Sequence, residues 1–256
     1  MTQPDTPDHQ AQHQIAQDLI AAGLRPGGCA LVHSSLSSLG YVPGGAETVI
    51  QGVLAALGPA GTLLMPALSY EHVHARQPFF DVLRTPSNVG AIPEAFRIRP
   101  GTQRSVNPTH SVCGIGPRAA ELLGRHHEDE TPCGPHSPFR LLRQAGGQIV
   151  FLGCGLRPNT SMHSVEEVIE PPYLFGGMAE YRARLLNGDE ITLRCRRHNF
   201  AGYAQRYDRL AGLLKARELR TGRVLRAIAH IVECAPMWDR ALAALRRDPL
   251  FFVEPV

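Results

Sequence analysis

The sequence lacks the features that mark several common classes of protein. It has no run of 18 apolar residues, so we expect no membrane-spanning helix. Its formal net charge is only +3 and its arginines are scattered, which disfavours nucleic acid as a partner. The six cysteines form no Cys-x-x-Cys pair, and several lie in apolar runs, so we expect a reduced, cytoplasmic protein.

The first residues lack the apolar core of a signal peptide. Residues 1–14 are polar and contain prolines, so we expect a flexible N-terminal tail over this stretch. The remaining residues, 15–256, show no linker composition, and 43% of the chain is apolar. This is enough to bury one core, so we expect a single domain.

Apolar runs of strand length alternate with segments of helical spacing. The sequence predicts strands at 29–33, 62–66 and 148–152, and helices at 15–24, 48–57, 89–98, 119–123, 139–144, 203–214 and 237–245. Asn187-Gly188-Asp189 predicts the turn of a C-terminal β-hairpin. We therefore expect an α/β/α fold: a mostly parallel central sheet flanked by helices, with an additional C-terminal hairpin and helices.

A candidate catalytic pair follows the predicted strand at 148–152. A glycine turn leads to a helix that Thr160 or Ser161 is expected to cap, and on that helix His163 and Glu166 stand at positions i and i+3. A histidine oriented by a carboxylate can accept a proton at neutral pH. The alternative is a capped surface helix with an ordinary i,i+3 pair, and the spacing alone leaves both open.

Other polar segments leave alternatives open as well. The serines that follow His33 suit a phosphate group, or they form a solvated loop between a strand and a helix. Arg104 and His110 suit phosphate, or they cap turns. His126-His127-Glu128-Asp129 invites a metal, but adjacent loop residues rarely converge on one ion, so we expect no metal.

Eight short motifs occur in a fixed order along the chain. They are His33-Ser34-Ser35-Leu36, Gly44-Gly45, Gly58-Pro59-Ala60-Gly61-Thr62-Leu63-Leu64-Met65-Pro66, Thr85-Pro86-Ser87, Arg104-Ser105, His110-Ser111-Val112, Gly134-Pro135-His136-Ser137-Pro138-Phe139 and Asn159-Thr160-Ser161-Met162-His163-Ser164-Val165-Glu166. Together they closely resemble the aminoglycoside 3-N-acetyltransferase family, from about residue 15 to residue 249. The resemblance implies an acetyl-CoA-dependent α/β fold distinct from the more common N-acetyltransferase (GNAT) fold.

The resemblance also implies roles for individual residues. His163 matches the catalytic base and Glu166 its carboxylate partner. The chemistry of the transfer also calls for a group that stabilises the oxyanion, and backbone N–H groups or a hydroxyl such as that of Thr160 are the candidates. The segments expected to meet acetyl-CoA or line the cleft contribute His33, Ser34, Ser35, Leu36, Arg104, Ser105, Ser111, Val112, Ser137 and Phe139. The chain departs from the family pattern at Asn107-Pro108 and at Cys113-Gly114, which lie outside the pair.

The implied reaction is direct transfer of an acetyl group to an aminoglycoside amine, expected at the 3-amino group of 2-deoxystreptamine. Because aminoglycosides are polycations, we expect acidic residues in their pocket, and Asp81, Glu167 and Glu170 are the candidates, although each also reads as a solvated charge. The rival functions are transfer to another amine, a serine–histidine thioesterase and a non-catalytic binding module. No Gly-x-Ser-x-Gly motif supports the hydrolase. We expect a monomer or a homodimer.

Overall fold

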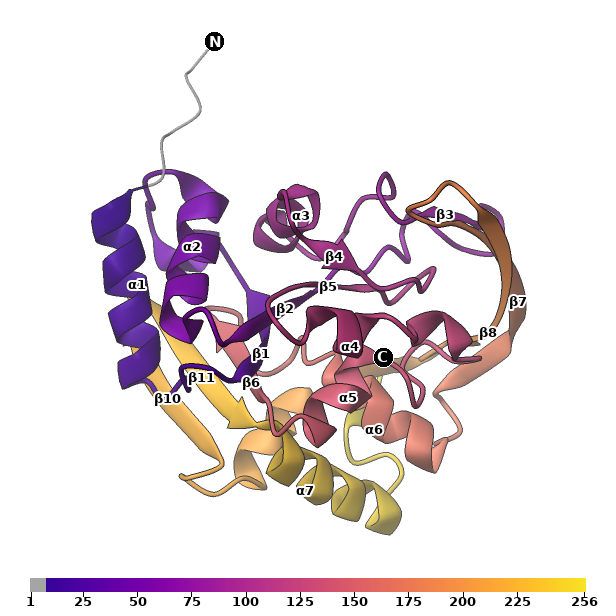
Figure 1. The fold of residues 1–256 in the computed structure, drawn as a ribbon. Coiled ribbons are helices and arrows are strands. Elements are labelled where there is room, and N and C mark those ends of the chain that lie inside the picture. Colours follow the sequence, from indigo (N-terminus) through magenta and orange to yellow (C-terminus); the bar gives the residue numbers. More distant parts are fainter. Residues whose placement is uncertain (1–7) are drawn as a thin grey trace.

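A seven-stranded sheet forms the centre of the computed structural model, which describes residues 8–256 (Figure 1). Its strands, in spatial order, are β10 (Leu219–Val224), β11 (Ala227–Glu233), β6 (Gln148–Leu152), β1 (Cys29–Ser34), β2 (Thr62–Pro66), β5 (Val112–Ile115) and β4 (Gln103–Arg104). The central strands β6, β1 and β2 pair in parallel, and the remaining pairs are antiparallel. Five of the seven strands therefore run in one direction, and only β11 and β5 oppose it.

The central strands form because their apolar runs are covered on both faces. Along β1, Ala30 and Val32 point into one hydrophobic cluster, whereas Leu31 points into another. Alternate side chains of a strand lie on opposite faces of the sheet, so each cluster belongs to one face. A continuous apolar run, rather than an alternating one, is expected of a strand buried in this way.

Helices cover both faces of the sheet, which confirms the α/β/α expectation. On one face lie α1 (His9–Ala21), α2 (Gly45–Leu57) and α3 (Ala91–Ile98). On the other lie α4 (Ala119–Leu123), α5 (Pro138–Gln144), α6 (Ser161–Ile169) and α7 (Cys234–Arg247). Short 3-10 helices occur at Ser37–Leu39, His126–Glu128 and Tyr207–Gly212. The strands predicted at 29–33, 62–66 and 148–152 are confirmed.

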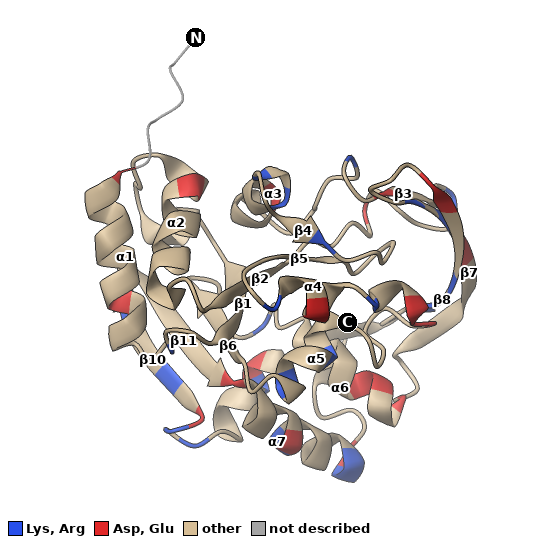
Figure 2. Cartoon of the chain, viewed as in Figure 1, with Lys and Arg blue, Asp and Glu red and all other residues tan. Residues whose placement is uncertain are grey.

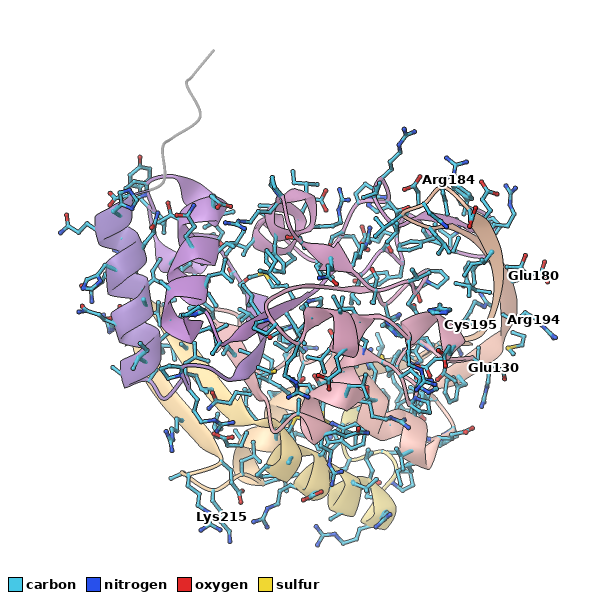
Figure 3. The ribbon with its side chains drawn as sticks, viewed as in Figure 1. Glu130, Glu180, Arg184, Arg194, Cys195 and Lys215 are labelled. Carbon is cyan, nitrogen blue, oxygen red and sulfur yellow. The ribbon has the colours of Figure 1, made fainter. Side chains whose placement is uncertain are left out.

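The predicted hairpin forms a second, smaller sheet beside the first. Strands β7 (Phe175–Arg184) and β8 (Glu190–His198) pair antiparallel, and β3 (Phe79–Asp81) adds to β7 in parallel. Glu180 pairs with Arg194 across the hairpin, and Figure 3 shows both side chains, with Arg184, on the outer side of the molecule. The last residue of β8, His198, instead reaches the interior, where 5% of its side chain is exposed.

Two sequence predictions differ from the structure. Helix α1 begins at His9, capped by the side chain of Asp8, so residues 9–14 of the expected tail are helical, and residues 1–7 lie outside the described residues. The helix predicted at 203–214 is wrong: the segment is strand β9 (Tyr203–Gln205) followed by the 3-10 helix Tyr207–Gly212. β9 pairs with β12 (Val253–Pro255), and this long-range pairing outweighs local helical spacing.

The described residues also bear on the composition-based expectations. No helix among them is both long enough and apolar enough to cross a membrane. All six cysteines carry free thiols, and five of them are buried. Charged side chains are spread over the elements without a single-sign face in view, as Figure 2 shows.

Candidate active site

A cleft of about 500 Å³ opens beside the start of α6. The chain leaves β6 through Gly153, whose φ of 75° favours glycine, and residues 157–160 then line the cleft. β8 contributes His198, and the segment that follows β9 contributes Tyr207. The cleft thus begins where the carboxyl end of a central strand meets a helix N-terminus, the usual ligand position in open α/β sheets.

The predicted pair of His163 and Glu166 is formed. The Nδ1 atom of His163 lies 3.2 Å from Oε2 of Glu166 on the same face of α6. The glutamate side chain is fully buried, whereas 13% of the histidine side chain is exposed, and the ring lines the cleft. The carboxylate therefore holds the imidazole from behind while the ring meets solvent.

Two tyrosines complete the environment of Glu166. The hydroxyl of Tyr173 donates to Oε1 at 2.8 Å, and that of Tyr207 donates to Oε2 at 2.8 Å. Tyr207 also lies 2.9 Å from Nδ1 of His163. Burial raises the pKa of both phenols, so they remain protonated donors. Nδ1 of His163 is therefore the nitrogen engaged by the protein, and Nε2 is the nitrogen left for a ligand.

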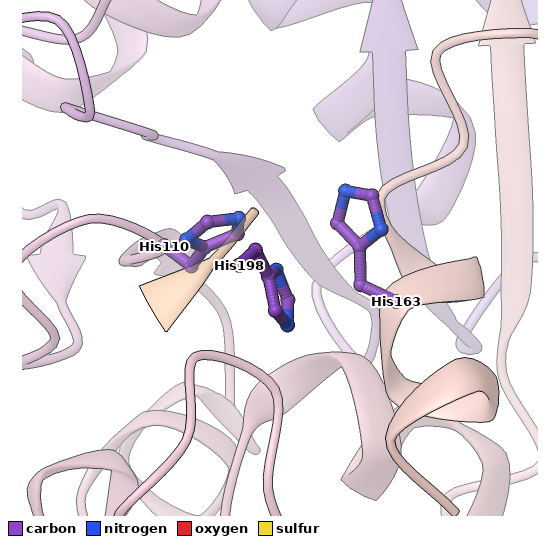
Figure 4. Close-up of side chains that lie close together, drawn as sticks. All are labelled: His110, His163 and His198. Atoms are coloured by element: carbon purple, nitrogen blue, oxygen red, sulfur yellow. The ribbon is translucent and has the colours of Figure 1, made fainter. Parts of the chain in front are cut away.

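Two further histidines, His110 and His198, lie together on one side of His163 in the cleft (Figure 4). Ring centroids lie 5.7 Å apart for His110 and His163, and 5.0 Å apart for His163 and His198. His198 Nε2 lies 2.8 Å from Oε1 of Glu167. Burial lowers the pKa of His110 and of His198 well below 6.5, with the neighbouring rings adding to the effect. Both rings are therefore neutral at neutral pH.

Burial also changes the pKa of Glu167, the carboxyl group that contacts His198. Loss of solvent raises the pKa of this carboxyl to about 7, despite hydrogen bonds from the Thr131 hydroxyl and the Cys133 amide. A group that titrates there is partly protonated at neutral pH. Its contact with His198 is therefore a hydrogen bond to a neutral imidazole rather than a full ion pair.

A second cavity of about 110 Å³ adjoins the cleft. It is lined by His33 and Ser34 at the end of β1, and it shares Val89, Pro158 and Thr160 with the cleft. Among the described residues, His33 Nε2 and Ser34 Oγ are buried without a hydrogen-bond partner. Burial lowers the pKa of His33 to about 3. The first two residues of the predicted serine segment thus border a space next to His163.

Thr160 is placed where a cleft ligand can reach it. It stands at the N-cap position of α6 with a buried side chain, but its hydroxyl makes no capping bond. The expected cap is therefore absent, and Ser161 is the first helical residue. The hydroxyl of Thr160 is therefore available to hydrogen-bond a ligand in the cleft.

Several predicted ligand residues do not line either cavity. Ser35 Oγ accepts a hydrogen bond from the Ser38 hydroxyl, and the partly buried Leu36 packs against the core. Ser137 caps α5, and Phe139 and Val112 are core residues. Contact of these five residues with a cofactor stays a prediction.

Three other predicted ligand residues make hydrogen bonds inside the protein instead: Arg104, Ser105 and Ser111. The Arg104 guanidinium donates to Ser111 Oγ at 2.9 Å and to the carbonyl oxygens of Thr85 and Ala67 at 2.6 and 3.0 Å. Burial lowers its pKa to about 10, so it stays charged. Ser105 Oγ lies 2.9 Å from Nδ1 of the buried His126. These contacts tie the loops beside β4 and β5 to the sheet.

The predicted acidic substrate residues also lie outside the cleft lining. Asp81 accepts the amides of Leu83 and Arg84, and Glu170 pairs with Arg196 at 2.8 Å. Glu167 is buried behind His198. Among the described residues, no carboxylate lines the cleft, and Arg157 is the only lysine or arginine that does.

Three residues of the site carry no local signal in the sequence. Tyr173 and Tyr207 approach Glu166 from positions 7 and 41 residues further along the chain. His198 ends the half-exposed strand β8, and nothing in the sequence around it indicates that its side chain is buried. Only the contacts of the folded chain bring these side chains to α6.

Comparisons with known proteins all find similarity to aminoglycoside acetyltransferases. A family model described as aminoglycoside 3-N-acetyltransferase matches residues 31–246. Aminoglycoside N(3)-acetyltransferase VIII of Streptomyces fradiae is 35% identical over 176 residues, which cover 62% of this chain but only 61% of the relative.

Solved structures agree over almost the whole chain. A variant of aminoglycoside acetyltransferase AAC(3)-IVa in complex with a gentamicin is 27% identical with a TM-score of 0.81, covering 100% of this chain and 94% of the other. AAC-IIIb, in a binary complex with CoASH, is 26% identical with a TM-score of 0.79, covering 92% of this chain and 96% of the other.

Proposed function

This chain belongs to the aminoglycoside 3-N-acetyltransferase family, and we propose that it transfers an acetyl group from acetyl-CoA to an amine of an aminoglycoside. By the resemblance, the 3-amino group of 2-deoxystreptamine is the expected acceptor. The observation that carries the proposal is the His163–Glu166 pair: Tyr207 contacts both side chains, and the His163 ring lines a cleft of about 500 Å³.

His163 is proposed to act as the general base. An amine nucleophile loses a proton as its nitrogen bonds to the acetyl carbon of the thioester, and the carbon–sulfur bond then breaks to release the thiol. Nε2 of His163 accepts the amine proton, while Nδ1 stays in hydrogen-bond contact with Glu166 and Tyr207. The buried carboxylate stabilises the resulting imidazolium. A positioned base of this kind contributes about 10²- to 10⁴-fold to a rate.

The start of α6 is proposed to stabilise the developing oxyanion. Thr160 carries a hydroxyl without a capping bond, and it stands at the positive end of the helix dipole. It also lines the junction between the two cavities. An acetyl carbonyl held at this junction lies close to both Thr160 and His163.

The residues at the end of β1 fit a polar group of the donor. His33 Nε2 and Ser34 Oγ are buried and lack partners among the described residues, which costs free energy unless a ligand supplies one. AAC-IIIb binds CoASH, and its fold matches this chain. We infer that the second cavity receives part of acetyl-CoA next to Thr160.

A second acceptor class is favoured by the charge of the cleft. Polycationic substrates are normally met by carboxylates, yet none lines the cleft among the described residues, and Arg157 adds a positive charge. An amine with fewer positive charges avoids this repulsion. Transfer to such an amine uses the same base and the same donor.

One experiment separates these possibilities. Purified protein is incubated with acetyl-CoA and a panel of amines that includes several aminoglycosides and several amines with one positive charge, and free thiol is measured. Acetylation of an aminoglycoside supports the first acceptor class, and acetylation of singly charged amines alone supports the second. Thiol release without any amine points to hydrolysis, and no release with the whole panel contradicts acetyl transfer.

A further inference from the structure

Three histidine rings converge in the cleft from three separate segments. His110 lies in the loop before β5, His163 in the first turn of α6, and His198 at the end of β8 (Figure 4). One ring nitrogen of each lies within 4.8 Å of those of the other two. The rings are inclined to one another by 64° to 80°. The rings are therefore not stacked, and it is the proximity of their nitrogens that brings three possible ligand atoms together in the cleft.

Each ring is held by an outer partner through one nitrogen only. Glu166 and Tyr207 engage Nδ1 of His163, Glu167 engages Nε2 of His198, and the Thr109 hydroxyl lies 2.9 Å from Nδ1 of His110. This arrangement, in which a carboxylate or hydroxyl fixes one nitrogen and leaves the other free, is the one found around metal-ligating histidines.

The free nitrogen of His198 is an independent sign of a missing ligand. Nδ1 is buried without a hydrogen-bond partner among the described residues, in a side chain that is 5% exposed. A buried polar atom without a partner costs free energy, and a cation in the cleft supplies one.

The donor set narrows the kind of ion. Three imidazoles without a carboxylate suit Zn²⁺, Co²⁺ or Ni²⁺, whereas Mg²⁺ and Ca²⁺ require oxygen ligands. Zinc–nitrogen distances of about 2.0–2.1 Å place ligand nitrogens about 3.3 Å apart, so each nitrogen has to move by less than about 1 Å. Three protein ligands leave one coordination position open toward the cleft.

We propose that His110, His163 and His198 form a binding site for one divalent transition-metal ion of the Zn²⁺ class, and that the bound ion inhibits acetyl transfer. The ion occupies the lone pair of His163 Nε2, which is the lone pair that accepts the amine proton. Binding rests on the geometry alone, whereas inhibition rests on the proposed function.

The test uses Zn²⁺ alone as the probe, titrated into metal-free protein by calorimetry, with Co²⁺ absorbance as a report of coordination geometry. His198→Gln removes a ligand but keeps a donor toward Glu167. The control variant, His9→Ala with His13→Ala, removes an exposed i,i+4 pair on α1 that lies outside the cleft. We expect one Zn²⁺ per chain, at least tenfold weaker binding in His198→Gln, and unchanged binding in the control.

Activity is then measured as zinc occupancy rises. We expect the transfer rate to fall in proportion to occupancy and to recover when a chelator is added. No binding, or binding that disappears in the α1 control and persists in His198→Gln, overturns the site. Binding at the site with an unchanged transfer rate overturns the inhibitory role. If no amine is acetylated, the calorimetry still decides the metal site.

Discussion

At the scale of single residues, the site centres on one buried carboxylate with three neighbours that satisfy it. Glu166 contacts Tyr173, Tyr207 and His163. Burying a carboxylate is costly unless it is hydrogen-bonded, so these contacts hold both the glutamate and the imidazole in a single orientation. Tyr207 is the only one of the two tyrosines that also contacts the histidine.

Replacing Tyr207 with phenylalanine tests this arrangement. The substitution removes one hydrogen bond to Glu166 and the contact with Nδ1 of His163, and we expect kcat to fall by about 10- to 100-fold with little change in KM for acetyl-CoA. Steady-state kinetics provide the measurement.

Tyr173→Phe is the matched control, since Tyr173 donates to the same carboxylate but does not contact the histidine. We expect a smaller loss of kcat in this variant. Equal losses in the two variants contradict a specific role of Tyr207 in positioning the ring.

The residues of the site differ in how far the sequence predicts them. His163 and Glu166 are three positions apart on one helix, so helix geometry alone places them together. Tyr207 and His198 lie 44 and 35 positions from His163, and only the tertiary fold brings them close. The residues predicted to bind the cofactor differ in their positions. His33 and Ser34 border a cavity, whereas the Arg104 guanidinium is hydrogen-bonded to backbone carbonyl groups inside the protein.

At the scale of elements, the turn between β6 and α6 positions the helix that carries His163 and Glu166. Gly153 has φ of 75°, and its amide donates to the carbonyl of Ile228 at 3.0 Å. A Cβ atom at this position would lie 2.7 Å from Cβ of Ser38. The turn therefore requires glycine for its backbone conformation and for the close approach of the serine segment.

The substitution Gly153→Ala is expected to destabilise the protein strongly. Left-handed backbone strain costs roughly 1–2 kcal/mol for a residue with Cβ, and the clash with Ser38 adds about 1–3 kcal/mol. The free energy of unfolding is measured by denaturant titration.

Gly155→Ala is the control for this prediction. Gly155 has φ of 63°, but a Cβ atom added there would meet no heavy atom within 4 Å, so only the strain remains. Losses of the same size in both variants contradict a tight contact at Ser38.

The sequence predicts the elements that depend only on their own apolar pattern. It does not predict the elements whose structure depends on pairing with distant parts of the chain. The strands at 29–33, 62–66 and 148–152 and the hairpin turn follow from apolar runs and from Asn187-Gly188-Asp189. The segment 203–214 has helical spacing, yet β12 pairs with its first residues and prevents a helix. The antiparallel strands β11 and β5 carry no sequence mark of their direction.

At the scale of the whole molecule, a buried histidine links folding to pH. His126 is fully buried between Ser105 Oγ at 2.9 Å and the carbonyl oxygen of Pro132 at 3.0 Å. Burial lowers its pKa from 6.5 to about 4, and His127 and His136 nearby add to the effect. The unfolded chain therefore binds a proton at a higher pH than the folded chain does.

Stability is expected to fall as pH drops from 6.5 toward 4. Above pH 6.5 the contribution of His126 is complete, and below it this contribution declines by about 1.4 kcal/mol per pH unit, roughly 3 kcal/mol in all. His126→Gln keeps a donor and an acceptor but does not titrate, so its curve should be flatter over this range. Parallel curves for the two proteins contradict the assignment.

The central claim concerns His163, and its most direct test combines turnover with donor binding in His163→Ala. With an accepted amine from the panel, we expect kcat to fall by about 10²- to 10⁴-fold while the Kd for acetyl-CoA changes little. His230→Ala, on β11 and outside the cleft lining, is expected to behave as the wild type. Turnover near the wild-type rate in His163→Ala would contradict the proposed base.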